Sequence, residues 1–305
     1  MARNPLTINT SAKCSDQRMF EYLLPNCTLK ETFESLSKDI IKYSENDFPN
    51  FGAEIASPFQ GGRFSNIFEV TLSDKTKYAL KLYKTSDECR FNFLNDLHCL
   101  KLFRHQHIVS MKGYFQNNSN GILLELLERD NLRDIINDKK LIENKLKTQW
   151  CAQIASGLAY IHSISYCHSD IKPENICFTP QFREVKICDF GSAINETDTK
   201  TSNCGSSYYR APELFKGQPF TDKCDVYSFS ITMWELFTYK IPYPNLSADE
   251  LFWAIASGIS SLELNDSNIP DIIKNILEVC LSSEAAKRLT AAQLQLHLSN
   301  LSSQD

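Results

Sequence analysis

The stretch from Cys167 to Ile176, CHSDIKPENI, places several chemically useful side chains at short spacing. Asp170 offers a carboxylate that can orient an attacking hydroxyl and accept its proton. Lys172 would stand beside a transferring phosphoryl group, and the amide oxygen of Asn175 can ligate Mg²⁺. We expect His168 to be a packed structural histidine rather than a proton carrier. This set suits phosphoryl transfer, which asks a protein mainly for positioning and charge neutralisation.

Two other stretches offer parts for the same reaction. Lys81 lies in YALKLY, where a strand would hold its ammonium on a fixed line toward nucleotide phosphates. Asp189 follows the apolar run VKIC, and a carboxylate at a strand end is well placed to bind Mg²⁺. Gly191 should give the chain freedom to turn just after it. Each signal alone is weak, because an isolated lysine of this kind is usually a surface residue on an edge strand.

A further group of segments carries no catalytic chemistry of its own. It consists of GSSYYRAPELFKG, CDVYSFSITMW and AAKRLT, all in the C-terminal half of the chain. Glu213 and Arg288 within it could form a buried ion pair. Such a pair needs good geometry to offset the desolvation of both charges.

Taken together and in order, Lys81, H-x-D-x-K-P-E-N, D-F-G and A-P-E resemble the signature set of eukaryotic protein kinases. The resemblance covers about residues 54–299. It implies an α+β bilobal fold, with a small β-rich N-lobe, a larger helical C-lobe and ATP between them. Lys172 marks serine/threonine specificity in that family, and Ser206 stands where such kinases usually carry a threonine that touches the catalytic aspartate.

The resemblance also assigns roles to individual residues. Asp170, Lys172 and Lys81 would be catalytic, and Asn175 and Asp189 would hold Mg²⁺. The residues implied in nucleotide binding are Gly62, Phe64, Ala79, Lys81, Asp96, Leu124, Glu125, Leu127, Asn175, Cys177 and Asp189. Among these, Leu124 would be the gatekeeper before a hinge at Glu125–Leu127, and Ala79 and Cys177 would sandwich the adenine. The family's regulatory spine would comprise Leu100, Met111, His168 and Phe190, anchored by Asp225.

The glycine-rich loop departs from the family pattern. G-x-G-x-x-G aligns with residues 60–65, QGGRFS, and keeps only the middle glycine, Gly62. Glycines let backbone amides approach phosphates, so Gln60 and Ser65 should lower nucleotide affinity. Gly62 and Phe64 at the tip still allow the loop to cover the phosphates.

The carboxylate partner of Lys81 also departs from the pattern. Counted back from His105, the helix presents Asp96 where the family has glutamate. An aspartate is one methylene shorter, so the helix must sit closer or the ion pair must lengthen. Glu88 is the alternative partner, although it lies about two turns too early.

Ser169 replaces the arginine that usually precedes the catalytic aspartate. In the family this arginine binds a phosphate on the activation segment and touches neither ATP nor substrate. We therefore predict activity that does not require phosphorylation of this segment. Its candidate phosphorylation sites are Thr197, Thr199, Thr201 and Ser202.

Composition limits the class of protein. The chain has 305 residues, a net charge of -5 and no dense run of Lys or Arg, which disfavours nucleic acid or an anionic membrane as partner. Its apolar stretches are too short to span a bilayer, and its N-terminus does not resemble a secretory signal. The 11 cysteines are scattered, with no C-x-x-C pair, which favours a reducing cytoplasmic location over disulfides or zinc.

Residues 1–48 form a predicted accessory segment. Thr28–Glu31 fits a capping box. Apolar residues then follow at helical spacing: Leu29, Phe33, Leu36 and Ile40. We expect this helix to lay its apolar face on the domain that follows; the alternative is a helix that binds a partner.

The rest of the chain divides into residues 49–127, the N-lobe, and residues 128–300, the C-lobe. The first contains strand-like runs on either side of a helical stretch near 87–104: 65–72, 77–83, 107–115 and 121–127. The second is mostly helical, with predicted helices within 146–163, 225–237, 248–258, 271–281 and 291–301.

Three functions are compatible with these features. The leading one is an active serine/threonine protein kinase, because the residues that an inactive kinase would lose are present: Lys81, Asp170, Asn175 and Asp189. A pseudokinase scaffold, which binds nucleotide and partners without efficient transfer, is supported by the altered loop, Asp96 and Ser169. A small-molecule kinase of related fold leaves RAPEL and DVYSF unexplained.

Within the family, the C-terminal half resembles the Mos group most. The features concerned are YRAPELFKG, DVYSFSITMWEL and the non-arginine residue before Asp170. That group acts on MAP kinase kinases. The resemblance therefore implies a protein substrate with a serine or threonine acceptor, and a MAP kinase kinase as that substrate.

Overall fold

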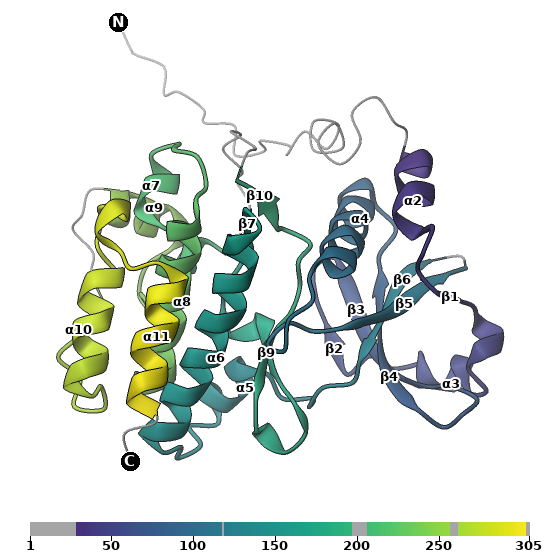
Figure 1. Ribbon diagram of the computed structural model, residues 1–305, viewed down its shortest axis with the longest axis horizontal. Coiled ribbons are helices and arrows are strands. Elements are labelled where there is room, and N and C mark those ends of the chain that lie inside the picture. Colours follow the sequence, from purple (N-terminus) through teal and green to yellow (C-terminus); the bar gives the residue numbers. More distant parts are fainter. Residues whose placement is uncertain (1–28, 118, 197–205, 257–261, 303–305) are drawn as a thin grey trace, which may run out of the picture.

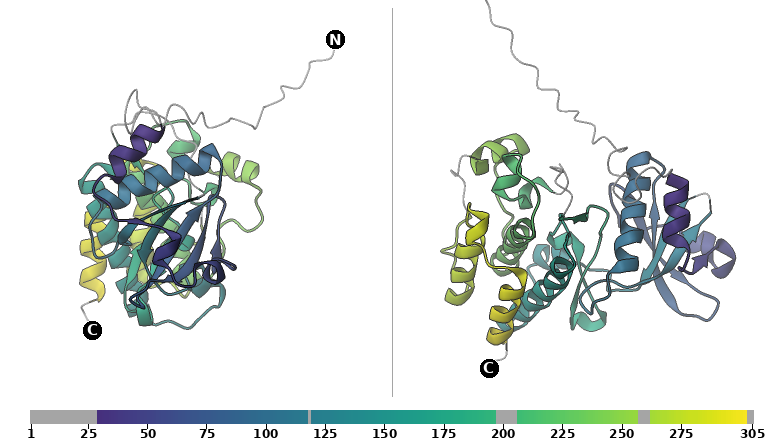
Figure 2. Two further views of the ribbon diagram at one scale, coloured as in Figure 1. Left: turned by 90° about the vertical axis from the view of Figure 1, so that its right-hand side faces the viewer. Right: turned by 45° about the horizontal axis from the view of Figure 1, so that its top comes forward.

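The computed structural model describes residues 29–117, 119–196, 206–256 and 262–302. They form two lobes of different character, one built around a β-sheet and one mostly helical (Figure 1). The lobes lie side by side along the long axis of the molecule (Figure 2). The α+β bilobal fold predicted from the motifs is confirmed.

The N-lobe contains a six-stranded sheet in the order β1-β5-β6-β4-β3-β2. Its strands are β1 (Lys42–Tyr43), β2 (Gln60–Gly61), β3 (Ser65–Thr71), β4 (Lys77–Tyr83), β5 (Met111–Gln116) and β6 (Asn120–Glu125). Neighbouring strands are antiparallel except β1 and β5, which are parallel. Because side chains alternate along a strand, Lys81 and Tyr83 share one face of β4, whereas Leu80 and Leu82 lie on the other.

Helix α4 (Asp87–Leu102) covers the face of the sheet that carries Lys81. It begins after Ser86, whose hydroxyl accepts a hydrogen bond from the Cys89 backbone N–H at 3.2 Å. The opposite face packs on the short helix α3 (Phe51–Glu54). The buried side chains of that outer cluster are Phe48, Phe68, Val70, Leu80, Phe115 and Leu123. α4 therefore links the inner face of the sheet with the second lobe.

The N-terminal segment packs on the N-lobe, as the sequence predicts. α2 (Leu29–Ser37) lies against α4, and Phe33, Leu36 and Ile40 pack on the main hydrophobic core (Figure 1). Beyond the expected helix, β1 adds an edge strand to the sheet, so the segment and the N-lobe share one sheet. Thr28 of the predicted capping box lies outside the described residues.

The C-lobe is helical with two small sheets near the other lobe (Figure 1). Its helices are α5 (Leu132–Asn137), α6 (Asn144–Ser163), α7 (Pro212–Phe215), α8 (Asp222–Thr238), α9 (Ala248–Ala256), α10 (Asp271–Cys280) and α11 (Ala291–Ser302). Two antiparallel strand pairs, β7–β10 and β8–β9, consist of β7 (Tyr166–Cys167), β8 (Ile176–Phe178), β9 (Val185–Ile187) and β10 (Ile194–Asn195). In the described parts of the chain, no helix combines the length and apolar character needed to cross a bilayer.

Helix α8 is buried on every side from Cys224 to Thr238, and the hydroxyls among its apolar side chains donate to backbone carbonyls one turn earlier. The expected ion pair between Glu213 and Arg288 lies beside it and is present. Two parallel hydrogen bonds, of 2.6 and 2.7 Å, join the guanidinium to the carboxylate. Burial would raise the pKa of Glu213, but the Arg288 charge and hydrogen bonds lower it. This paired geometry is the kind that a buried ion pair requires.

Candidate active site

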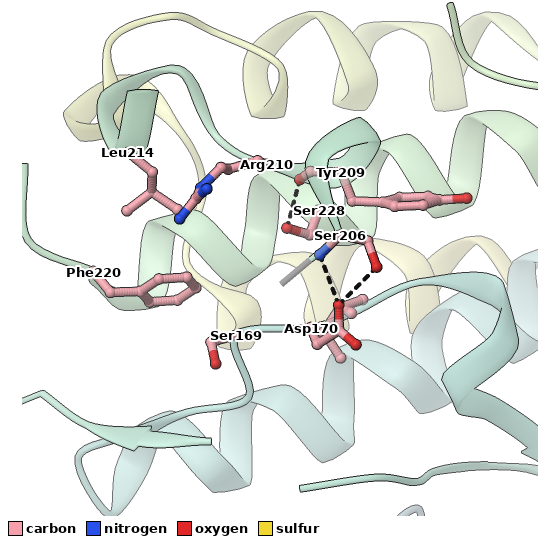
Figure 3. Close-up of a pocket in the computed structure, with 9 residues that line it drawn as sticks. Ser169, Asp170, Ser206, Tyr209, Arg210, Leu214, Phe220 and Ser228 are labelled. Atoms are coloured by element: carbon pink, nitrogen blue, oxygen red, sulfur yellow. Dashed lines mark hydrogen bonds between the residues drawn. The ribbon is translucent and has the colours of Figure 1, made fainter. Parts of the chain in front are cut away.

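The loop between β7 and β8 places Asp170 at the centre of a hydrogen-bonded group. Lys172 Nζ lies 2.6 Å from Asp170 Oδ2. Asn175 Nδ2 donates to the Asp170 carbonyl oxygen at 2.8 Å and to Oδ2 at 3.2 Å. The backbone N–H and the hydroxyl of Ser206 donate to Oδ1 at 2.9 and 3.1 Å (Figure 3). Lys172 and Asn175 of the motif and the expected serine therefore converge on the Asp170 carboxylate.

Asp225, in the first turn of α8, fixes the backbone of this loop. Its two carboxylate oxygens accept the N–H groups of His168 and Ser169 at 2.7 and 2.9 Å. His168 is completely buried, and its ring lies 5.0 Å from that of Phe190. It is thus packed as the sequence predicts. Of the other proposed spine residues, Leu100 is buried in the same core cluster, and Met111 packs against that cluster.

Asp189 stands just after β9 and faces Lys81. Lys81 Nζ lies 2.9 Å from Asp189 Oδ1. Burial would raise the pKa of Asp189, but the charge of Lys81 and its hydrogen bond lower it to about 2. Burial likewise lowers the pKa of Lys81, while the charges of Asp189 and Asp96 raise it well above its usual value. Both groups are therefore charged near neutral pH.

The reason given for Gly191 from the sequence is wrong. The left-handed conformation is at Asp189, with φ 65°, and Gly191 has no positive φ. Glycine is required at position 191 by space, because a Cβ there would lie 2.4 Å from Asn92 Oδ1. The turn after β9 thus packs directly on α4.

Lys81 also pairs with the aspartate expected from the helix. Asp96 Oδ2 lies 2.5 Å from Lys81 Nζ, and Asp96 is only 1% exposed. The alternative partner, Glu88, instead pairs with Arg63 at 2.9 Å. α4 sits close enough to the sheet for the shorter side chain to reach, so the ion pair does not lengthen.

The altered glycine-rich segment still forms a hairpin. The N–H of Gly62 donates to the Ser65 carbonyl at 2.9 Å, closing the turn between β2 and β3. At its tip the Arg63 guanidinium lies 4.9 Å from the centre of the Phe64 ring. The pairing of Arg63 with Glu88 ties this hairpin to the first turn of α4.

The residues expected around an adenine lie where β6 leads into the C-lobe. Ala79 on β4 is opposite Leu124 on β6. The Glu125 side chain accepts the Ser110 N–H at 2.7 Å and pairs with Lys186 at 2.8 Å. Leu127 lies in the connection after β6, which ends at Glu125. Cys177 lies on β8 and is partly exposed. Two strands of one lobe, the connection after β6 and one strand of the other lobe thus carry the predicted set.

Asn175 and Asp189 offer the oxygen ligands that Mg²⁺ prefers. The Cys188 N–H donates to the Asn175 carbonyl at 2.9 Å, which brings the two residues onto neighbouring segments. Asn175 Nδ2 turns toward Asp170, so its Oδ1 points the other way. Asp189 pairs with Lys81 through Oδ1, and its side chain is 44% exposed. These two hard oxygen donors fit the metal that the motifs imply.

Ser169 takes the place of the expected arginine without leaving the loop unsupported. It has φ 62°, and its hydroxyl donates to the Ser192 carbonyl. Beyond it lies a small pocket whose lining includes Tyr209, Arg210 and Phe220 (Figure 3). The four candidate phosphorylation sites at 197–202 lie outside the described residues.

Two polar residues of this region were missed from the sequence. The Tyr83 hydroxyl donates to Asp96 Oδ2. Asn95 Nδ2 donates to the carbonyls of Phe190, Gly191 and Ala193 at 3.1, 3.1 and 2.8 Å. A signal for Asn95 was available, since polar residues at positions 92, 95 and 96 recur with helical spacing and so lie on one face of the predicted helix.

Comparisons with known proteins agree with this geometry. The model of the protein kinase domain matches residues 60–298. A Drosophila melanogaster protein named putative mitogen-activated protein kinase kinase kinase 7-like is 30% identical over 80% of this chain and 65% of its own length. Bos taurus mitogen-activated protein kinase kinase kinase 7 is 28% identical over 82% of this chain and 43% of its own length.

The Caenorhabditis elegans kinase dlk-1, also named a mitogen-activated protein kinase kinase kinase, is 30% identical over 65% of this chain but only 22% of its own length. The chain thus spans less than two thirds of each of these relatives. The family model, in contrast, covers most of the chain and includes every candidate site residue. The chain therefore belongs to the protein kinase family, as its signature motifs predicted.

Proposed function

We propose that this chain is a serine/threonine protein kinase, which transfers the γ-phosphate of ATP to a serine or threonine of a protein substrate. The observation that carries the proposal is the convergence of Lys172, Asn175 and Ser206 on Asp170, beside an intact Lys81–Asp189 contact. Residues 49–127 and 128–300 would be the two lobes that enclose the nucleotide.

Each residue has a distinct task in this reaction. Asp170 orients the acceptor hydroxyl and takes its proton as the oxygen attacks the γ-phosphorus, while ADP departs. Lys172 neutralises charge on the transferring group, and Lys81 holds the α- and β-phosphates. Mg²⁺, held by Asn175 and Asp189, would supply further charge neutralisation at the phosphates. The nucleotide would lie against Gly62, Phe64, Ala79, Leu124, Glu125, Leu127 and Cys177.

The nature of the protein substrate is part of the same proposal. The relatives described above are named as kinases of MAP kinase kinases, which supports a MAP kinase kinase as acceptor here. This substrate also agrees with the likeness to the Mos group in the C-terminal half. We further propose a cytoplasmic location, which is supported by cysteines that are scattered and form no C-x-x-C pair.

A pseudokinase scaffold is the second candidate. The altered glycine-rich hairpin and the Ser169 replacement favour it. The replacement of the usual glutamate by Asp96 does not favour a scaffold, because Asp96 still reaches Lys81 at 2.5 Å. A scaffold would bind ATP and Mg²⁺ at the same residues without transferring phosphate efficiently.

Transfer of labelled γ-phosphate to a MAP kinase kinase and to a generic protein substrate tests the proposal. Asp170→Asn should lower the rate by about 10² to 10⁴-fold, because the base is lost while the loop keeps its shape. Asp189→Asn should abolish transfer, because it removes a charged metal ligand. Asp138→Asn is the matched control, since that side chain is 59% exposed and pairs with Lys140, which is not a residue of the candidate site. A wild type no faster than Asp170→Asn, with ATP still bound, would establish the scaffold instead.

A further inference from the structure

The Lys81–Asp96 pair is held by more groups than the family motifs describe. Asp96 uses both carboxylate oxygens: Oδ2 accepts from Lys81 and from the Tyr83 hydroxyl, and Oδ1 accepts the Phe190 N–H at 2.7 Å. This one side chain therefore connects β4, α4 and the segment that carries Asp189. All its hydrogen-bond donors are buried or nearly so, since Lys81 is 6% and Tyr83 4% exposed.

We propose that Tyr83 is a positioning residue that allows an aspartate to replace the usual glutamate, and that residues 29–43 brace it through Phe33 and Phe93. The inference rests on the proposed kinase function, because it concerns how Lys81 is aligned for ATP. Tyr83 touches neither nucleotide nor metal in this scheme. It acts by fixing the carboxylate that fixes the lysine.

The shorter side chain explains why a positioning group is required. Asp96 has one methylene fewer than glutamate, so α4 must approach the sheet closely for the carboxylate to reach Lys81. Lys81 also has a second carboxylate available, Asp189 at 2.9 Å. The hydrogen bond from the Tyr83 hydroxyl to Asp96 Oδ2 holds that oxygen toward Lys81, while the hydrogen bond from the Phe190 N–H holds Oδ1.

Tyr83 remains a neutral donor in this setting. Burial raises the pKa of its hydroxyl well above the usual value, and the charge of Asp96 raises it further. The Lys81 ammonium also lies 5.2 Å from the centre of the Tyr83 ring, a distance that suits a cation–π contact. Tyr83 therefore stabilises the charged forms of both partners of the ion pair.

A line of aromatic rings connects Tyr83 with the N-terminal segment. The Tyr83 ring meets Phe93 edge-on at 5.3 Å, and Phe93 stands three residues before Asp96 on α4. Phe33 of α2 lies 5.8 Å from Phe93 and 5.4 Å from Tyr114. Two ring contacts thus join α2 to the residue that orients Asp96.

Polar contacts also hold the end of α2 against α4, about two turns beyond Phe93. Lys101 Nζ on α4 donates to the Leu36 carbonyl at 3.0 Å and lies 3.9 Å from Asp39. Farther along, the Tyr114 N–H donates to the Ile41 carbonyl at 2.9 Å as the chain enters β1. Figure 1 shows α2 beside α4 at the edge of the N-lobe. The segment is therefore placed to press α4 toward the sheet.

A double-mutant cycle tests the role of Tyr83. Tyr83→Phe removes the positioning hydroxyl and should lower kcat/KM for ATP by about 10-fold or more. Asp96→Glu should also lower it, because the longer side chain crowds that hydroxyl. Tyr83→Phe with Asp96→Glu should recover most of the activity, since the glutamate then fills the space of the hydroxyl and meets Lys81 as in the family. Losses that simply multiply in the double variant would overturn the proposal.

Matched controls separate positioning from general damage. Tyr78→Phe removes a hydroxyl from the same strand, but on the opposite face of the sheet, in the outer cluster. It should leave kcat/KM for ATP close to that of the wild type. Phe33→Ala should lower kcat/KM, whereas Phe51→Ala, in the outer cluster, should lower stability alone. Equal activity losses in Phe33→Ala and Phe51→Ala would contradict the brace.

Amide hydrogen exchange of the nucleotide-free chain keeps this test independent of the proposed function. Tyr83→Phe and Phe33→Ala should accelerate exchange at the Phe190 amide and along 87–102, and Tyr78→Phe should not. If the wild type transfers no phosphate but this pattern is found, the kinase proposal fails and the positioning role stands. Unchanged exchange in Tyr83→Phe would overturn the positioning role whether or not the chain is active.

Discussion

At the scale of single residues, the candidate site keeps the signature residues of the family but has Ser169 where the family usually carries arginine. Asp170, Lys172 and Asn175 are joined by hydrogen bonds of 2.6 to 3.2 Å, which is the arrangement that the proposed transfer requires. Ser169, in contrast, donates to the Ser192 carbonyl and has no charge with which to hold a phosphate. We therefore propose that the change affects regulation more than catalysis.

We predict from Ser169 that phosphorylation of the activation segment is dispensable. A variant with alanine at Thr197, Thr199, Thr201 and Ser202 should transfer phosphate at a rate within about threefold of the wild type. The reason is that position 169 has no arginine to bind a phosphate on this segment. Initial rates of labelled γ-phosphate transfer would measure this, with phosphatase-treated wild type as the control. A loss as large as that of Asp170→Asn would refute the prediction.

At the scale of elements, the N-terminal segment is the main addition to the predicted N-lobe. β1 lies parallel to β5, with Lys42 opposite Tyr114 and Tyr43 opposite Phe115. Such close approach depends on Gly113, because a Cβ there would lie 2.5 Å from both the Ile41 carbonyl oxygen and the Tyr43 ring. The pairing of β1 with β5 therefore requires glycine at position 113 of β5.

Gly113→Ala should therefore displace β1 from the sheet. We expect the free energy of unfolding to fall by about 1–3 kcal/mol, as for overpacking at other crowded sites. Urea unfolding would measure the change. Gly52→Ala is the matched control, since Gly52 lies in α3 and a Cβ there meets no atom within 4 Å; alanine at that position should be neutral or stabilising. Equal effects of the two substitutions would argue against a docked β1.

At the scale of the whole molecule, the two lobes are connected by a shared core and by titratable groups near their junction. His105 and His107 follow α4. The His107 ring nitrogen Nδ1 lies 3.1 Å from the Val185 carbonyl of β9, and the His107 carbonyl accepts the Ile187 N–H at 2.9 Å. His98 on α4 contacts the Tyr166 hydroxyl of β7 at 2.9 Å. Burial lowers the pKa of all three histidines below the usual value.

These shifts predict loss of stability in mild acid. A histidine with a lowered pKa in the folded chain takes up its proton more readily in the unfolded chain, where the pKa is about 6.5. Stability should therefore be full above that value and fall as the pH drops below it. Urea midpoints at pH 7, 6 and 5 would show the decline, and replacing His98, His105 and His107 with glutamine should flatten it. The same replacement at exposed His297 is the control.

How far the sequence predicted this molecule differs from one feature to another. The longer strands and helices lie close to the stretches expected from the sequence, since propensity and spacing are properties of the local chain, whereas the two-residue strands β1, β7 and β10 were not predicted. The catalytic loop was predictable for the same reason, because Asp170, Lys172 and Asn175 are close in sequence. Even Asp96 followed from counting along one helix.

The sequence by itself determined which residues could do chemistry and in what order the elements run, because residue type and short spacing are local information. Only the tertiary structure decided what surrounds them. Asp96 meets Phe190 across 94 positions and Tyr83 across 13, and the crowding that requires glycine at 191 comes from Asn92. No local pattern encodes such contacts, since they arise when a helix, a strand and a loop pack into one core.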